Sequence, residues 1–273
     1  MKARRNGRPE RAALAWSRGL HYGDGVFRTL LKYQSQIIDI EHHLKKISDD
    51  CARLHLAPPD HDALYADSLA VSRERETAVI KWLVLRQAGD RGYAPGGEAS
   101  ERLVLCAPPP SYPAACWTQG IRALRSAVTL APQPLLAGVK HLNRLEQVLA
   151  SRGWPDGVLE ALQTDPGGHP LCGTRSNLFW VKNGCLYTPD LGLGGVCGIM
   201  RNKIMHLAHS LNIPLYVVRA PWQSLLEADE AFICNALIGL WPLRALDERR
   251  WPAPGPVSRR LQAALAHPRL VAA

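Results

Sequence analysis

A run of prolines near the middle of the chain most constrains how this sequence can fold. Residues 108–113 read Pro-Pro-Pro-Ser-Tyr-Pro, and proline both fixes φ and lacks a backbone N–H donor. Neither a helix nor an inner strand is therefore expected to pass through them. We predict a smaller N-terminal α+β domain over residues 1–108, a proline-rich linker over residues 109–116 and a larger C-terminal domain over residues 117–273.

Apolar patterning gives each half both strands and helices. In the first half we predict strands over residues 26–33, 37–40, 78–85 and 103–107. A helix over residues 40–54 is expected there because apolar residues recur on one helical face: Leu44, Ile47, Cys51 and Leu54. The second half is expected to contain strands over residues 121–128 and 158–164, a tight turn over 165–168 and a helix over 199–211. The fold class that follows is α+β.

The composition indicates a packed globular protein, and its basic charge needs an explanation. The chain is 47% hydrophobic and 21% charged, with a formal net charge of +9. Nucleic-acid binding is one interpretation of that charge. However, the basic residues are dispersed and accompany no recognition motif. We therefore expect a solvated basic surface, some arginines that serve anionic small molecules, and no nucleic-acid partner.

Three features of the chain favour the cytoplasm. No apolar run reaches the length of a membrane span, and the basic N-terminus is not followed by the apolar region of a secretory signal. Seven cysteines occur without CxxC pairs, which favours reduced thiols over disulfides or a zinc site. We predict a cytoplasmic protein with no membrane association and no bound metal.

One lysine stands out by its surroundings. Lys140 follows an apolar run for which we expect burial, namely Leu135, Leu136, Ala137 and Val139. Beyond it, Asn143 and Glu146 resemble a capping box, and apolar residues recur at helical spacing: Leu142, Leu145, Val148 and Leu149. A lysine that loses hydration favours its neutral amine, which attacks an aldehyde to form a Schiff base. The alternative is a lysine whose ammonium group reaches solvent.

The sequence around this lysine resembles a known cofactor-binding segment. Residues 138–149 read Gly-Val-Lys-His-Leu-Asn-Arg-Leu-Glu-Gln-Val-Leu, which is similar to the cofactor-lysine segment of bacterial aminodeoxychorismate lyases. These enzymes belong to the branched-chain aminotransferase-like group of pyridoxal-phosphate enzymes, called fold type IV. The resemblance covers about residues 6–243 and implies two α+β domains, pyridoxal 5′-phosphate in the interdomain cleft, and a homodimer. It assigns Lys140 to the Schiff base with the cofactor and places Arg144 near the cofactor's ring oxygen.

A block near the N-terminus resembles the strand that lines the active site in this group. Residues 17–31 contain Gly-Asp-Gly-Val-Phe, as the group does, but Ser17 stands where the group has Asp and Arg28 where it has Glu. The resemblance places Tyr22, Phe27 and Arg28 near the substrate. Arg28 is either an added contact to a substrate carboxylate or a surface residue, and the sequence leaves both open.

Three basic residues match anion-binding positions of the group. Lys46 falls where the group has the arginine of a His-x-x-Arg-Leu sequence, which contacts the cofactor phosphate. Lysine binds phosphate as a point charge, without bidentate geometry, and an ordinary exposed helix lysine is the alternative. The loop after the strand at residues 78–85 resembles an arginine-containing loop of the lyases. That likeness makes Arg86 and Arg91 candidates for holding two substrate carboxylates.

Cys172 is the most consequential departure from the group. The group has Glu at this position, and that glutamate keeps the pyridine nitrogen of the cofactor protonated. A neutral thiol does not hold a pyridinium, whereas a thiolate stabilised by nearby positive charge would. A transaminase would suffer badly from the change. A lyase that forms an aromatic product has a strongly favoured product, so a weaker electron sink suffices; a slow or inactive site is the alternative.

Two further blocks match the group's phosphate contacts. A glycine-rich loop over residues 191–201 enters a predicted helix, and free N–H groups at a helix start attract phosphate. Its spacing fits neither a dinucleotide fingerprint nor a P-loop. The resemblance gives phosphate contacts to Ile199 and Met200 here, and to Asn235 and Ala236 in a later block. The apolar residues of that later block are expected in the core: Phe232, Ile233 and Leu237.

The resemblance implies a lyase that releases pyruvate from aminodeoxychorismate and yields 4-aminobenzoate for folate synthesis. Lys140 would remove the proton from the amine-bearing carbon as a general base. A branched-chain or D-amino acid aminotransferase is the first alternative, since most blocks are shared with that branch. A degenerate relative, with low activity or none, is the second, and Lys46 together with Cys172 suggests it.

Overall fold

The computed structural model describes residues 2–9, 17–87 and 92–271, which form two compact units. The first unit comprises Met1–Pro110 and Val139–Asn143, and the second comprises Ser111–Gly138 and Arg144–Ala273. The lysine segment Val139–Asn143 therefore belongs to the first unit, although it follows the proline run in sequence. The domain boundaries given above remain a prediction.

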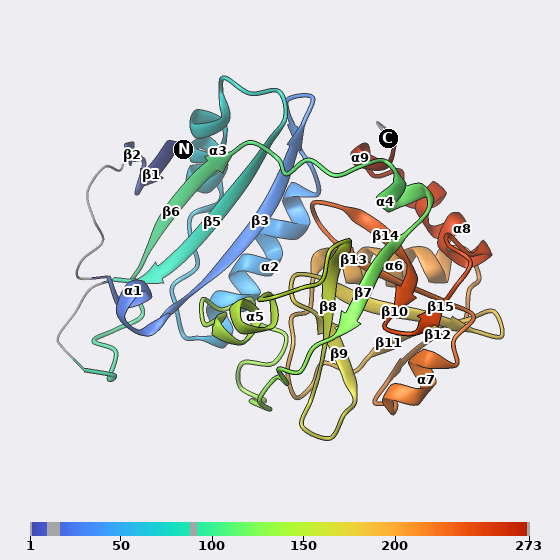
Figure 1. Ribbon diagram of the computed structural model, residues 1–273. Coiled ribbons are helices and arrows are strands. Elements are labelled where there is room, and N and C mark those ends of the chain that lie inside the picture. Colours follow the sequence, from blue (N-terminus) through green and yellow to red (C-terminus); the bar gives the residue numbers. More distant parts are fainter. Residues whose placement is uncertain (1, 10–16, 88–91, 272–273) are drawn as a thin grey trace. The chain divides into compact units, whose positions relative to one another are not determined.

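An antiparallel six-stranded sheet, in the order β2-β1-β6-β5-β3-β4, is the framework of the first unit's described residues (Figure 1). Its long strands are β3 (Gly25–Tyr33), β5 (Ala78–Arg86) and β6 (Ser100–Ala107), and its short strands are β1 (Lys2–Arg5), β2 (Arg8–Pro9) and β4 (Gln36–Ile37). The helices are α1 (Arg18–Tyr22), α2 (Ile40–Arg53) and α3 (His61–Ser72). These elements confirm the predicted long strands and the predicted helix at residues 40–54. The hairpin partner is shorter than expected, because only Gln36 and Ile37 pair with β3.

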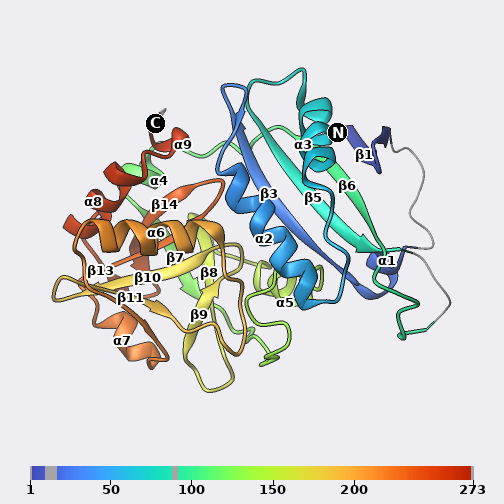
Figure 2. The same cartoon turned by 180° about the vertical axis from the view of Figure 1, so that it is seen from behind.

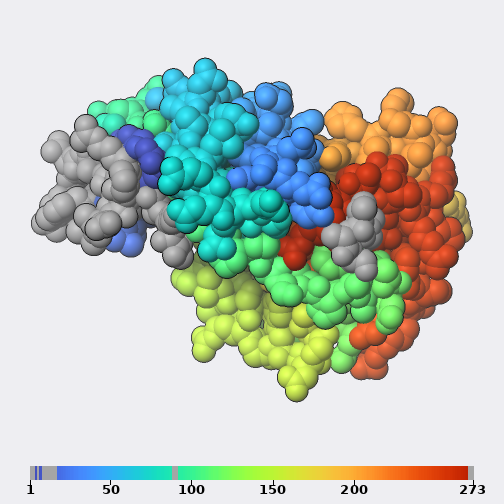
Figure 3. All heavy atoms as spheres, turned by 90° about the horizontal axis from the view of Figure 1, so that it is seen from above, coloured from blue at the N-terminus to red at the C-terminus, as the bar shows by residue number. Residues whose placement is uncertain are grey.

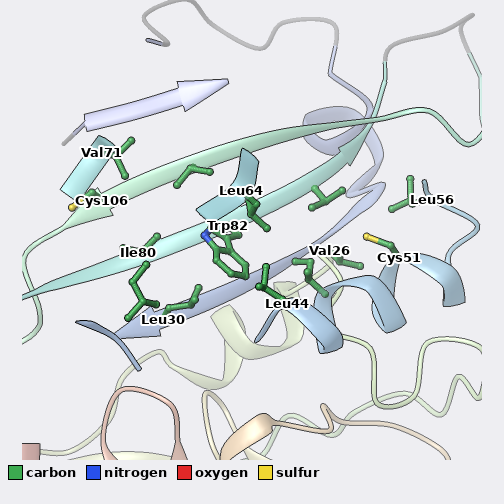
Figure 4. Packing of buried hydrophobic residues seen from close by; sticks show 14 of the residues in the cluster. Val26, Leu30, Leu44, Cys51, Leu56, Leu64, Val71, Ile80, Trp82 and Cys106 are labelled. Atoms are coloured by element: carbon green, nitrogen blue, oxygen red, sulfur yellow. The ribbon is translucent and has the colours of Figure 1, made fainter. Parts of the chain in front are cut away.

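Helices α2 and α3 pack on this sheet and enclose the first unit's hydrophobic core (Figures 2 and 4). Leu44 and Cys51 of α2 and Leu64 of α3 meet the strand residues there, as Figure 4 shows. Trp82 of β5 is fully buried among them, and its indole N–H donates to the Ser68 hydroxyl at 2.7 Å. The apolar face predicted for α2 is confirmed, since it is the face that this core buries.

The second unit is built on a mixed nine-stranded sheet in the order β12-β11-β10-β13-β14-β7-β8-β9, with β15 paired to β14. Its strands are β7 (Ile121–Arg125), β8 (Val158–Thr164), β9 (Pro170–Gly173), β10 (Asn177–Lys182), β11 (Cys185–Pro189), β12 (Leu215–Val218), β13 (Glu230–Asn235), β14 (Gly239–Leu246) and β15 (Arg249–Arg250). Its helices are α4 (Ala115–Thr118), α5 (Leu145–Ala150), α6 (Ile199–Ser210), α7 (Trp222–Leu226), α8 (Pro256–Leu265) and α9 (Pro268–Val271). The predicted strand at 158–164, the turn at 165–168 and the helix at 199–211 are present. The strand predicted over 121–128 is shorter than expected, because β7 ends at Arg125.

Helices α6 and α8 lie side by side over part of this second sheet. Figure 2 labels both helices, and Figure 3 shows the orange and red parts of the chain next to each other. Both helices contribute to a core cluster with β13 and β14. Phe179 and Phe232 stack in that cluster with ring centroids 5.1 Å apart. The predicted burial of Phe232 and Ile233 is confirmed, and Leu237 packs partly buried against a neighbouring cluster.

The stretch around Lys140 departs from two expectations. Leu135 is 76% exposed, so its predicted burial is wrong, whereas Ala137 and Val139 are buried. The predicted capping box is also wrong. Helix α5 begins after Arg144 without a side-chain cap, because the Glu146 carboxylate instead accepts from the Ala131 N–H at 2.9 Å. The Asn143 amide donates to the Gly23 carbonyl at 3.4 Å.

The described helices are also too short or too polar for a bilayer. None of them combines the length and the apolar character that a membrane crossing requires.

Candidate functional site

Lys140 lies on a strand-like segment that pairs with the start of β3. The Phe27 N–H donates to the Lys140 carbonyl at 2.9 Å, and the Leu142 N–H donates to the Gly25 carbonyl at 3.0 Å. The half-buried side chain carries its amine over the Phe27 ring, 4.5 Å from the ring centroid. Two residues that the sequence analysis singled out, Lys140 and Phe27, are thus adjacent within the first unit.

A buried carboxylate, Asp50, lies beside this segment. Asp50 is 0% exposed, and it forms ion pairs with the Arg28 guanidinium and the Lys46 ammonium group. It also accepts a hydrogen bond from the Lys140 N–H at 3.3 Å. Arg28 is 2% exposed, which excludes the surface-residue alternative that the sequence left open. Its contact with substrate and the contact of Lys46 with phosphate stay predictions. Sequence reasoning missed Asp50, although its position four residues after Lys46 on a helix was a signal for an ion pair.

The same region contains two other buried titratable groups. The pKa of His43 lies well below its ordinary value, first because burial disfavours the imidazolium and then because Arg28, His42 and Lys140 add positive charge. Burial, followed by the negative charge of Asp50, raises the pKa of the Cys51 thiol to about 12. His43 and Cys51 are therefore neutral at physiological pH.

Arg86 donates four hydrogen bonds within the first unit through its guanidinium group. It donates to the Asp24 carboxylate at 2.9 Å and to three backbone carbonyls, those of Leu54, His55 and Gly97, at 2.7–2.9 Å. A substrate carboxylate would have to compete with these acceptors, and the substrate role of Arg86 stays a prediction. Arg91 lies outside the described residues.

Arg18 holds the backbone that follows that loop by hydrogen bonds. It was not identified as a site residue from the sequence. It donates to Asp24 at 2.9 Å and to the Gly92 and Tyr93 carbonyls at 2.9 and 3.0 Å. Its guanidinium carbon lies 4.9 Å from the Tyr22 ring centroid, and Tyr22 contacts the edge of Tyr93. The predicted substrate contact Tyr22 therefore belongs to an ordered cluster. Arg18 and Gly19 align with the Arg-Gly of the group's Asp-Arg-Gly sequence, in which Ser17 replaces the Asp. That alignment could have identified Arg18 from the sequence.

In the second unit, Cys172 sits on β9, between β8 and β10. It pairs with Gln163 on one side and with Asn177 on the other. Its side chain packs in an apolar cluster, and the cluster's buried members besides Cys172 are Leu130, Leu171 and Leu191. The turn after it is held by Glu160, a buried residue that sequence reasoning also missed.

The start of helix α6 contains two predicted phosphate contacts. Gly198 is its N-cap and supplies no side-chain cap, and Ile199 and Met200 follow it, both buried. The Asn177 side chain fixes the approach to the helix, since it accepts from the Gly198 N–H at 3.2 Å and donates to the Val196 carbonyl at 2.7 Å. A Cβ at Gly198 would lie 2.4 Å from the Asn177 oxygen, so a larger residue there requires Asn177 or the start of the helix to move.

The other predicted cofactor contacts in this unit are positioned by turns. Asn235 ends β13, and its side-chain oxygen accepts from the Leu237 and Ile238 N–H groups at 2.9 and 3.0 Å. The next residue, Ala236, accepts a hydrogen bond at its carbonyl from His267 at 3.2 Å. Arg144 is the half-buried N-cap residue of α5.

Each unit, taken by itself, has a feature that suits one group of a cofactor carrying an aldehyde and a phosphate. A half-buried lysine amine over an aromatic ring suits an aldehyde. A twelve-residue helix whose N-terminus has no side-chain cap suits an anion. Within the described residues, no cluster of His, Cys, Asp or Glu side chains has the arrangement of a metal site.

Comparisons with known proteins agree with these features. The family model described as amino-transferase class IV matches residues 25–246. The aminodeoxychorismate lyase of Vibrio harveyi is 34% identical over 265 residues, which cover 94% of this chain and 97% of that protein.

Solved structures are similar over almost the whole chain. The 4-amino-4-deoxychorismate lyase from Pseudomonas aeruginosa has a TM-score of 0.91 and 42% identity, over 96% of this chain and 97% of that one. A branched-chain amino acid aminotransferase from T.th., solved with pyridoxamine 5′-phosphate, has a TM-score of 0.85 and 25% identity, over 97% of this chain and 92% of that one. These likenesses confirm the predicted α+β fold class.

Proposed function

Because the chain belongs to the amino-transferase class IV family, a group of fold type IV pyridoxal-phosphate enzymes, we propose that it is a 4-amino-4-deoxychorismate lyase. The reaction removes a proton from the amine-bearing carbon of the substrate and expels enolpyruvate, which leaves 4-aminobenzoate and pyruvate. 4-Aminobenzoate is then used in folate synthesis. One observation carries the proposal: the amine of Lys140 lies over Phe27 on a segment anchored to β3.

The proposed cofactor is pyridoxal 5′-phosphate, which when bound withdraws electrons from the carbon that carries the substrate amine. Lys140 would hold it by its amine. The helix start at Ile199 and Met200, together with Asn235 and Ala236, would bind its phosphate through backbone and side-chain donors. Lys46 would add a point charge to the phosphate, and Arg144 would approach the ring oxygen.

In the chemical step, Lys140 is the catalytic residue. Its neutral amine takes the proton from the amine-bearing carbon and then donates a proton to the departing enolpyruvate. Arg86 and Arg91 would bind the substrate carboxylates. Three further residues would line the same substrate, namely Tyr22, Phe27 and Arg28. Arg86 would do this while its other donors remain bonded to the loop carbonyls.

Cys172 bears on which reaction the protein catalyses. A thiol is at best a weak hydrogen-bond partner, so it holds a pyridinium less well than the family's glutamate does. A lyase accepts this weaker electron sink because its product is aromatic and strongly favoured. An aminotransferase gains no such driving force, which makes lyase activity the better proposal.

The alternative is a branched-chain or D-amino acid aminotransferase, since the aminotransferase from T.th. has a similar structure. A third option is a degenerate relative of low activity. Purified protein should therefore be assayed for 4-aminobenzoate and pyruvate from aminodeoxychorismate, and in parallel for transfer from branched-chain L-amino acids and D-amino acids to 2-oxoglutarate. We expect the first activity only, and a transaminase result would replace the proposal.

The lysine is tested separately from the substrate. We expect borohydride treatment of the pyridoxal-phosphate-loaded protein to place the reduced cofactor on the peptide containing Lys140. Lys140→Ala should lose both the label and the absorbance of the bound cofactor. A label on another lysine would overturn the assignment.

We further propose a cytoplasmic homodimer. Helix α5 exposes three apolar side chains, those of Leu145, Val148 and Leu149. Burial against a second copy of the chain would explain why apolar residues occupy these exposed positions. Light scattering of the purified protein should give twice the mass of the 30.1 kDa chain. A monomer at micromolar concentration would contradict this.

A further inference from the structure

Asp50 connects three parts of the first unit that are far apart in sequence. Its buried carboxylate pairs with Arg28 on β3 and with Lys46 on its own helix α2. The oxygen that pairs with Arg28 also accepts from the Lys140 N–H at 3.3 Å. A carboxylate with no exposed surface requires such partners, because burying it unpaired is costly.

The Lys140 backbone is held at both of its polar groups. Its N–H donates to Asp50, and its carbonyl accepts from the Phe27 N–H at 2.9 Å. Two such bonds fix the orientation of the main chain at residue 140. The direction in which the side chain leaves the backbone is fixed with it, toward the Phe27 ring.

Given the proposed function, we propose that Asp50 is the positioning residue of Lys140, which it holds through the backbone N–H. Arg28 and Lys46 act on the lysine through Asp50, because they keep its carboxylate charged and in place inside the protein. The resemblance to the lyases gives neither of them this role. Asp50 does not touch the reacting atoms, so it acts only by placing the amine.

Two double variants separate the hydrogen bond from the charge. Arg28→Leu with Asp50→Asn removes both ion pairs of Asp50 together with the Arg28 charge, and it keeps an acceptor for the Lys140 N–H. Arg28→Leu with Asp50→Ala removes both pairs and the acceptor. The probe is pyridoxal phosphate followed by borohydride, and the readout is the rate at which the Lys140 peptide is labelled. We expect the Ala double variant to label roughly fivefold more slowly than the Asn double variant, the effect of one net hydrogen bond.

The matched control lies one residue away on the same helix. Asp49 is exposed and pairs with Lys45 in the same i,i+4 geometry, so Asp49→Asn should label Lys140 at the rate of the unaltered protein. Equal rates in the two double variants would overturn the positioning role. No label on Lys140 in the unaltered protein would instead overturn the proposed function.

Hydrogen exchange gives a second measurement that needs no double variant. In the unaltered protein the Lys140 amide should exchange slowly, as a hydrogen-bonded amide does. Exchange at the rate of an unprotected amide would also overturn the inference, even if both double variants fail to fold.

Discussion

The Glu160 carboxylate accepts a hydrogen bond from the Ser176 hydroxyl at 2.7 Å, inside the turn that follows Cys172. Its other oxygen accepts from the Thr174 N–H at 3.0 Å and from the Thr174 hydroxyl at 2.5 Å. A Cβ at Gly173 would lie 2.7 Å from the Glu160 carboxyl carbon, so the turn closes tightly around this group. One fully buried carboxylate therefore determines the shape of the chain next to Cys172.

Replacing Glu160 should cost much of the protein's stability. Glu160→Ala leaves the Thr174 and Ser176 donors without their acceptor in a buried place, so we expect a loss of about 3 kcal/mol in the free energy of unfolding. Denaturant unfolding at pH 7 measures it. The exposed Glu248→Ala should change the same quantity by less than about 0.5 kcal/mol. A loss as small as that of the control would show that the turn forms without the carboxylate.

Gly198→Ala should weaken cofactor binding without unfolding the chain. The new Cβ would approach the Asn177 oxygen to 2.4 Å, which displaces either that side chain or the start of α6. We expect the Kd for pyridoxal phosphate to rise roughly tenfold, as a loss of about 1.4 kcal/mol implies. In the same loop, Gly192→Ala meets Asp190 only at 3.4 Å and should bind normally. Fluorescence titration with pyridoxal phosphate measures the Kd of both variants. Equal Kd values would show that the start of α6 does not bind the phosphate.

The sequence predicts the elements of this fold better than its polar contacts. Helix α2 and the long strands follow from local periodicity, because burial of one face imposes the 3.6- or 2-residue repeat on neighbouring positions. The exposed Leu135 shows the limit of that reasoning, since apolar residues also occupy much of a protein surface.

The candidate site shows the same division between local and long-range information. Lys140 and the α6 start carry recognisable local sequences. Asp50, by contrast, meets Lys140 across 90 positions of sequence, and no local pattern encodes such a contact. The failed capping box has a similar cause, because Glu146 bonds to Ala131, fifteen residues earlier in the chain.

The stability of Cys172→Glu should depend on the cofactor, and this dependence tests whether residue 172 lies at the pyridine nitrogen. Moving a carboxylate out of water into the apolar cluster of Leu130, Leu171 and Leu191 is costly, so the cofactor-free variant should lose about 1–3 kcal/mol of stability. Pyridoxal phosphate should restore most of that loss, because a protonated ring nitrogen pairs with the carboxylate. Lyase activity should stay the same or rise.

The control for this variant is Cys185→Glu on β11. Cys185 is half-buried, and its strand neighbour across the pair is Lys182. We expect a smaller loss of stability that pyridoxal phosphate does not reverse. Thermal unfolding with and without the cofactor measures both variants. Loss of lyase activity in a folded Cys172→Glu protein would show that residue 172 is not at the ring nitrogen.

His43 should make the protein less stable in mild acid. Its pKa is held well below 6.5 by burial and then by the positive charges of Arg28, His42 and Lys140. The unfolded chain therefore takes up a proton below pH 6.5 while the folded chain does not, so this stabilisation is complete above pH 6.5 and declines below it, by up to about 1.4 kcal/mol per pH unit. His43→Leu should flatten the fall in unfolding free energy between pH 6.5 and 5, whereas His209→Leu, at an exposed position of α6, should leave the slope unchanged. Equal slopes for His43→Leu and the unaltered protein would mean that the buried imidazole takes up its proton without unfolding.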